Sequence, residues 1–238
     1  MINKILVKEV DIVDTEPIRN SLLILKSATK SVNDFYALFQ AKSTANSRKQ
    51  DLLRAMLVFA CSGLDAIIKQ LIKDTLALII DADQNARKEL QKYVDRSLLQ
   101  KSSGGNEQSM RLIDTMKLAQ ILTSNNPRED MIDMHVASLC SDSLQSRDQI
   151  LRIAASFAIT KEAIMSDSDT IETAFSARNQ IIHEMDVELS DGKNRCERSE
   201  GVIKKYCEEI LLIGKKFIAV VSGKLDKAEK DSFKRIGE

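Results

Sequence analysis

The residues with the clearest chemical potential lie close together in the segment AFSARNQIIHEMDVE, residues 174–188. Arg178 is followed directly by Asn179, and His183, one of only two histidines in the chain, comes five residues after the arginine. A histidine side chain can accept and release a proton near neutral pH. An arginine is always charged and can hold a phosphate group through two hydrogen bonds. Together these residue types could carry out proton transfer beside a phosphate group.

The same segment has the pattern of an amphipathic helix in which the arginine takes an apolar position. At about 100° per residue, Arg178 falls near the centre of the apolar arc. An unpaired guanidinium is costly in a dry core. Arg178 therefore either pairs with a buried carboxylate, for which Asp65 is the natural candidate, or lies on a stripe that faces an interface or a cleft, and the two interpretations are compatible. The apolar arc comprises Ile171, Ala174, Phe175, Ile181, Ile182 and Met185.

The two histidines have different expected roles. Asn179 lies one helical turn before His183, so we expect its amide to reach the imidazole and help to set its tautomer. His135, in the segment MIDMHVASL, is expected on the face of a short helix and in a structural role.

The composition indicates an all-α protein. The 238 residues include only eight glycines and two prolines, and helix-forming residues are abundant. The net charge is zero, which gives no overall nucleic-acid signature, although RNA binding needs only a local patch. The locally basic C-terminal region supplies Lys193, Arg195 and Arg198 as candidate RNA contacts, and a solvated helix face is the alternative interpretation for most of its basic residues.

The four cysteines form no CxxC pair, and no cluster of cysteine and histidine suggests a metal site or a cofactor. The N-terminus lacks the pattern of a signal peptide, and no apolar run is expected to reach the length of a bilayer span. These features predict a cytoplasmic protein without a membrane segment.

The helical periodicity predicts a chain of helices without a linker between domains. We expect helices at about 17–40, 48–80 and 86–99, three or four short helices in 108–165, and a last long helix at about 196–224. The segment SDSD, residues 166–169, should cap the helix that carries Arg178, and SDGKN, residues 190–194, should end it. The prediction is a single domain over 1–238, an up-and-down helical bundle with core helices at about 16–80 and 168–225 and a helical insert at about 82–165.

Two segments resemble the HEPN superfamily of helical-bundle proteins, many of which are ribonucleases. RNQIIH, Arg178 to His183, resembles the R-(polar)-x-x-x-H signature of that superfamily. The earlier helix LLRAMLVFACSGLDAIIKQLIKD, residues 52–74, is similar to a long HEPN helix with an early arginine and a later acidic residue, here Arg54 and Asp65. The resemblance extends over about half of the chain and leaves residues 82–165 unmatched.

The resemblance implies a metal-independent endoribonuclease that acts in toxin–antitoxin systems or anti-phage defence. His183 would transfer protons, Arg178 would contact the phosphate and Asn179 would orient the base or the phosphate, with Arg54 and Asp65 in support. The products would carry 2′,3′-cyclic phosphate and 5′-hydroxyl ends. The implied partners are an RNA substrate, a second copy of the chain that completes the active site, and an antitoxin or regulatory protein.

One position departs from the family pattern. HEPN proteins that are silenced by a nucleotidyltransferase usually have a tyrosine two residues after the histidine, and Met185 occupies that position here. Silencing by modification of that tyrosine is therefore not expected. Two alternatives remain open: a non-catalytic HEPN-like module that binds nucleotides or a partner protein, and a helical regulator unrelated to HEPN in which Arg178 and Asp65 form a structural pair.

Overall fold

The computed structural model describes residues 4–5, 7–99, 119–121, 123–187 and 195–236. These residues form a packed helical bundle without a named strand, which confirms the all-α prediction. The only strand-like pairing among them is an isolated antiparallel bridge between Val187 and Arg195. Predictions about Lys193 and residues 100–118 lie outside the described residues.

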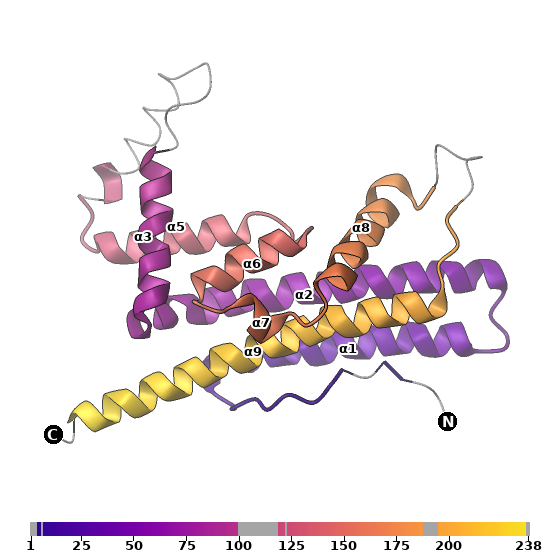
Figure 1. The fold of residues 1–238 in the computed structure, drawn as a ribbon, viewed down its shortest axis with the longest axis horizontal. Coiled ribbons are helices and arrows are strands. Elements are labelled where there is room, and N and C mark those ends of the chain that lie inside the picture. The colour runs from indigo at the N-terminus through magenta and orange to yellow at the C-terminus, as the bar shows by residue number, and fades with distance from the viewer. Residues whose placement is uncertain (1–3, 6, 100–118, 122, 188–194, 237–238) are drawn as a thin grey trace, which may run out of the picture.

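Three long helices make the body of the molecule (Figure 1). The short 3₁₀ helix η1, Glu16–Ile18, leads into α1, Arg19–Gln40, which packs along α2, Asn46–Ala82. The last helix, α9, Glu200–Ile236, packs against α2 and also contacts α1, and it extends well beyond the predicted end at 224. Because both α1 and α9 cover it, α2 has apolar side chains buried on a wide face, as its sequence pattern predicts.

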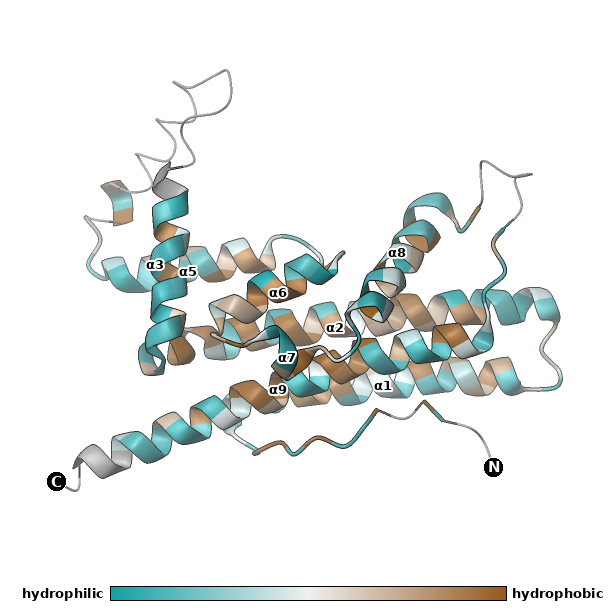
Figure 2. Cartoon of the chain, viewed as in Figure 1, coloured by the Kyte–Doolittle hydropathy of each residue, from teal (hydrophilic) through white to brown (hydrophobic). Residues whose placement is uncertain are grey.

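The middle of the chain forms a second layer over one end of α2. It contains α3, Gln84–Leu99, α5, Pro127–Cys140, α6, Arg147–Ser156, and the single turn α7, Lys161–Ile164. α3 and α5 contact α2, and α6 contacts both α3 and the helix at Ser168–Glu184. Figure 2 shows α3 as a mainly hydrophilic helix and α6 as a helix with both hydrophobic and hydrophilic residues.

The helix that carries the motif, α8, Ser168–Glu184, stands on α2 and α9 at the other end of this layer (Figure 1). Asp167 is its N-cap and accepts a hydrogen bond from the backbone N–H of Thr170, so the predicted cap within SDSD is present. The helix ends at Glu184, earlier than predicted, because Met185 and Asp186 adopt left-handed conformations with φ of 51° and 61°. That turn directs the Asp186 side chain into the body of the protein.

The expectation that no apolar run reaches the length of a bilayer span was too strong. α2 contains an 18-residue window with a mean hydropathy of 1.6, so by length and composition alone this helix could cross a membrane. Half of that window is buried inside the fold, as expected for the central helix of a bundle. The hydropathy of α2 therefore has a structural explanation within the bundle.

Candidate functional site

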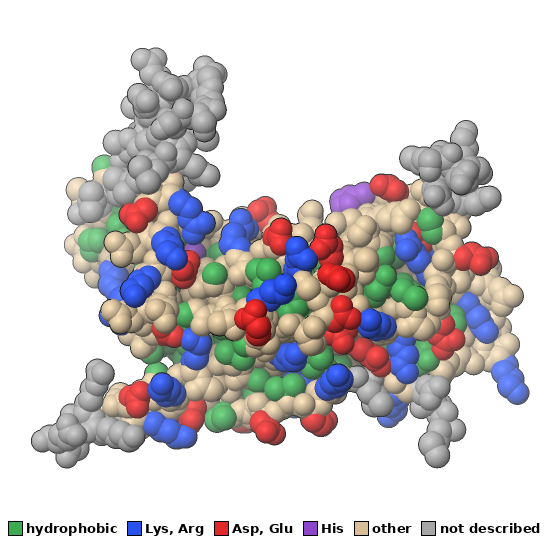
Figure 3. Space-filling model, in the orientation of Figure 1, with side chains coloured by type: hydrophobic (Ala, Val, Ile, Leu, Met, Phe, Trp, Pro, Cys, Tyr) green, Lys and Arg blue, Asp and Glu red, His purple; other side chains and the backbone are tan. Residues whose placement is uncertain are grey.

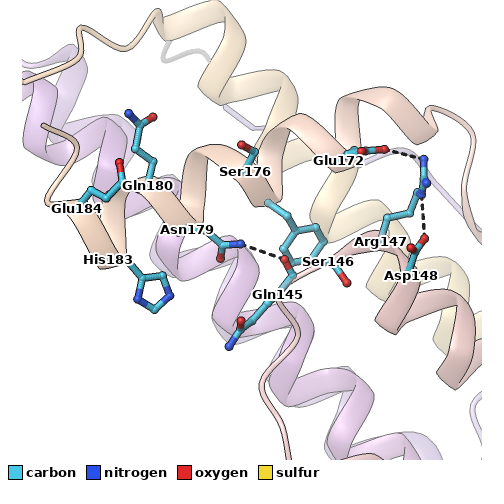
Figure 4. A pocket seen from close by; sticks show the side chains of 11 residues that line it. Gln145, Ser146, Arg147, Asp148, Glu172, Ser176, Asn179, Gln180, His183 and Glu184 are labelled. Atoms are coloured by element: carbon cyan, nitrogen blue, oxygen red, sulfur yellow. Dashed lines mark hydrogen bonds and ion pairs between the residues drawn. The ribbon is translucent and has the colours of Figure 1, made fainter. Parts of the chain in front are cut away.

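Two of the three motif residues lie in one pocket. Asn179 and His183 project from α8 into a cavity of about 490 Å³ between this helix and the start of α6. Figure 4 shows His183 at one end of the pocket, Arg147 at the other, and Asn179 between them. The remaining wall is polar except for one aromatic ring; it consists of Gln145, Ser146, Asp148, Glu172, Phe175, Ser176, Gln180 and Glu184.

His183 is exposed on the last turn of α8. The expected contact with Asn179 is not made, because the Asn179 amide has other partners. Its Nδ2 donates to the carbonyl oxygen of Gln145 at 3.2 Å, and its Oδ1 accepts from Arg178 Nη1 at 2.9 Å. No other described residue forms a hydrogen bond with the imidazole, so both ring nitrogens of His183 are accessible to a substrate.

Arg178 does not pair with Asp65, so the interpretation of these residues as a buried ion pair is wrong. Asp65 instead accepts a hydrogen bond from the backbone N–H of Leu144 at 2.8 Å and forms an ion pair with Lys69 at 3.0 Å. It therefore holds the segment before α6 against α2. The Arg178 side chain is half-buried, and its Nε has no partner among the described residues.

Arg178 also lies outside the pocket that contains His183. Its charge acts on Cys61 of α2: burial raises the pKa of that thiol to about 12, and Arg178 opposes the rise. The apolar stripe around Arg178 is buried in its first half and open in its second half, where Ile182 is 40% and Met185 is 66% exposed. This arrangement agrees with a stripe that faces an interface or a cleft.

Arg147, at the start of α6, supplies the positive charge that lines the pocket. Its Nη1 lies 2.8 Å from a carboxylate oxygen of Glu172 and donates to Ser168 at 3.2 Å. These partners hold the guanidinium between α6 and α8. Nothing in the sequence pattern around Arg147 pointed to this position, because it depends on how α6 packs against α8.

A buried ion cluster fixes the end of α8 next to His183. Asp186 is fully buried, and Arg54 Nε donates to one of its carboxylate oxygens at 2.6 Å. Arg198 Nε contacts both carboxylate oxygens at 3.1 Å, and its Nη2 donates to Gln180 at 2.8 Å. Burial alone would raise the pKa of Asp186, but the hydrogen bonds from Arg198 and Arg54 outweigh it and hold the pKa below its ordinary value. We call Arg54, Asp186 and Arg198 the aspartate cluster.

The cluster changes the roles assigned to several sequence candidates. Arg54 supports the site by holding Asp186, and its Nη2 also donates to the carbonyl oxygen of Cys196 at 2.7 Å. The Arg198 side chain is only 17% exposed and is paired with Asp186, which argues against direct contact with RNA. Arg195 is half-exposed and lies 2.8 Å from Asp51, so it remains near the surface.

The described residues contain no group of three His, Cys, Asp or Glu side chains placed to hold a metal ion, and their cysteines are all free thiols. On the face seen in Figure 3, basic and acidic side chains are interspersed, so no large patch of one sign covers it. What the pocket offers is an accessible imidazole, an amide and a guanidinium along one polar wall. Such a set can transfer a proton and donate hydrogen bonds to a ligand, while Arg147 is itself paired with Glu172 and Asp148.

Comparison with known proteins identifies the family. A family model described as RiboL-PSP-HEPN matches residues 24–221, a span that includes the middle segment 82–165. No curated protein and no solved structure gives a significant match. The match covers well over half of the chain and includes both segments that resemble HEPN proteins. The chain belongs to the RiboL-PSP-HEPN family, within the HEPN superfamily.

Proposed function

We propose that this protein is an endoribonuclease that needs no metal ion and cleaves RNA by attack of a ribose 2′-hydroxyl on the adjacent phosphate. The observation that carries the proposal is the position of His183: its imidazole is exposed in a polar pocket, on the helix that holds the family motif. Membership of the HEPN superfamily supports the same activity.

In this reaction the 2′-oxygen forms a bond to phosphorus, and the bond from phosphorus to the 5′-oxygen breaks. One basic group takes the 2′-hydroxyl proton, and an acid returns a proton to the departing 5′-oxygen. His183 can serve either step because an imidazole ring can both accept and donate a proton. The products carry 2′,3′-cyclic phosphate and 5′-hydroxyl ends. A guanidinium would stabilise charge on the phosphate oxygens.

The proposed active site is completed by a second copy of the chain. In one copy Arg178 lies outside the pocket, and Ile182 and Met185 are exposed beside His183. Pairing of two α8 helices would cover these apolar side chains and bring both motifs to one groove. We expect the purified protein to sediment as a dimer and Met185→Glu to shift it toward monomer; a wild-type monomer at high concentration would contradict this.

The test of the activity is cleavage of a mixed RNA pool in the presence of EDTA. His183→Ala should lower the rate by about 10²–10⁴-fold, since that is the usual contribution of a positioned acid–base group. Its melting temperature should stay close to wild type because the side chain is exposed. Thr173→Ala, an exposed substitution on α8 outside the pocket, is the matched control and should keep full activity. Undiminished cleavage by His183→Ala would reject the assignment.

One observation favours the alternative of a non-catalytic module that binds nucleotides or a partner protein. The motif arginine lies close enough to Cys61 of α2 to affect its pKa and does not line the His183 pocket. If the wild-type protein forms the dimer and cuts no RNA, this alternative replaces the first proposal.

A role in toxin–antitoxin systems or antiviral defence is part of the same proposal, with an antitoxin or regulatory protein as partner and the cytoplasm as its location. Growth arrest on expression that disappears in His183→Ala would support it. Normal growth on expression of a chain that cleaves RNA when purified would argue against the toxin role.

A further inference from the structure

The second histidine is buried without a hydrogen-bonding partner. His135 on α5 is 4% exposed, and neither ring nitrogen has a partner among the described residues. Its ring lies against Tyr93 of α3, with ring centroids 4.4 Å apart. Buried polar atoms are nearly always hydrogen-bonded, and an unsatisfied one is costly. The role expected from the sequence, a structural side chain, leaves these two nitrogens unexplained.

His135 lines a pocket of about 400 Å³ between α3, α5 and α6. Two arginines, Arg96 and Arg152, and two serine hydroxyl groups line the same space, together with Glu89. Glu89 is already engaged by Lys92 at 2.6 Å, so its charge is balanced within α3. Arg152 is exposed and its guanidinium has no partner among the described residues. The hydroxyl groups belong to Ser138 and Ser156.

The pocket therefore carries an excess of positive charge and of hydrogen-bond donors. Burial, with a smaller contribution from Arg96 and against the effect of Glu89, lowers the pKa of His135 to about 4. The imidazole is thus neutral near pH 7 and offers one N–H donor and one acceptor nitrogen. The pocket volume of about 400 Å³ lies within the range of small-molecule sites. It suits a ligand of the size of a mononucleotide or smaller.

We propose that this pocket binds a small phosphate-bearing molecule, with Arg96 and Arg152 contacting the phosphate and His135 hydrogen-bonding to the ligand. Paired guanidinium groups suit a phosphate because each can donate two hydrogen bonds to its oxygens. The hydroxyl groups of the two serines can donate to the remaining oxygens. The unsatisfied imidazole then has the partner that the protein itself does not supply.

This pocket is separate from the one that contains His183, and no residue lines both. The helix α6 links them: its first residues line the His183 pocket and its last residues line the His135 pocket. The proposed binding does not depend on ribonuclease activity and can be tested on a catalytically inactive protein.

Because the chain has only two histidines, one in each pocket, imidazole NMR can report on the two sites separately. Inorganic phosphate and then AMP are titrated into ¹⁵N-labelled full-length protein, with adenosine as the ligand that lacks the phosphate. We expect the His135 ring signals to shift to saturation with AMP, with little change at His183, and no shift with adenosine.

Arg152→Gln should weaken AMP binding by about tenfold or more, as expected for loss of a hydrogen bond to a charged group. Arg48→Gln, at an exposed arginine in the first turn of α2 and outside both pockets, should bind as wild type does. Three results would overturn the proposal: no His135 shift with either phosphate or AMP, a shift confined to His183, or unchanged binding by a folded Arg152→Gln protein.

Discussion

Asp186 is the residue on which the geometry next to the proposed active site depends. It is buried between Arg54 of α2 and Arg198, which lies just before α9, and its backbone N–H donates to the carbonyl oxygen of Gln180 at 3.1 Å. These contacts fix the turn that follows His183 directly. The cluster therefore determines where α8 ends and how its last turn faces the pocket.

Asp186→Ala should lower the free energy of unfolding by about 3–5 kcal/mol, because two arginines would lose their buried partner. Asp186→Asn should cost less, since asparagine keeps an acceptor oxygen and tolerates the left-handed conformation. Urea denaturation of both variants measures the difference. Equal stability of Asp186→Ala and wild type would show that the arginines find other partners or water.

The sequence could predict which side chains share a helix face, but not their partners on other elements. The helical period places Asn179 and His183 one turn apart, and both line the same pocket. The pairing of Arg178 with Asp65 failed because Asp65 binds the backbone before α6, which the helical period cannot show. Asp186 was missed because it lies in a left-handed turn after the helix, where no periodic pattern applies.

At the scale of elements, the contact between α1 and α2 depends on a close approach at Gly63. A Cβ atom at this position would lie 2.5 Å from the Cβ of Ala28 on α1. Such a distance is far below van der Waals contact, so α1 and α2 would have to move apart. Only glycine allows the two helices this spacing.

Gly63→Ala should destabilise the protein by about 1–3 kcal/mol through overpacking, even though alanine is the better helix former. Gly223→Ala on α9 is the matched control because a Cβ there meets nothing within 4 Å. It should stabilise by about 1 kcal/mol through helix propensity alone. Thermal unfolding measures the melting temperatures of the two variants. If both substitutions changed the melting temperature in the same direction, the close approach of α1 and α2 at Gly63 would be contradicted.

Helix positions were largely predictable because caps and apolar periods are local features. The predicted helix at 48–80 corresponds to α2 at Asn46–Ala82, and the predicted helix at 86–99 corresponds to α3 at Gln84–Leu99. The end of α9 was placed too early because its last turns lack an apolar stripe. Residues 225–236 are instead rich in charged side chains, with three lysines, one arginine and three acidic residues, and the side chains of Lys230 and Asp226, 2.7 Å apart, support the helix as an i,i+4 pair.

At the scale of the whole molecule, three aspartates join elements that are distant in sequence. Asp186 joins the end of α8 to α2, Asp167 joins its start to Lys205 of α9, and Asp83 joins the end of α2 to Lys224. All three have a pKa below the ordinary value of 3.8. For Asp167 the main causes are hydrogen bonds from Thr170 and Lys205; for Asp83 the hydrogen bond from Lys224 helps to outweigh burial.

A carboxylate whose pKa is lower in the folded state stabilises that state above its unfolded pKa and loses the effect as the pH falls through its folded pKa. The melting temperature should therefore be insensitive to these groups above about pH 5 and should fall steadily below about pH 4. Calorimetry between pH 7 and pH 2 measures it. The melting temperature of the Asp186→Asn variant should fall less steeply in this range. A pH dependence identical to that of wild type would exclude Asp186 as a contributor.

The central position of α2 also decides how the molecule opens. α2 packs against α1, α9, α8, α3 and α5, so no layer of the bundle can separate without exposing part of it. Local opening requires a region with few buried contacts. The middle turns of α2 contain no such region, because each of them has buried side chains. Its backbone amides should therefore exchange with deuterium only when the entire chain unfolds. The last turns of α9, whose side chains from Lys227 to Ser232 are largely exposed, should exchange within the native state, in contrast to the buried turns of α2.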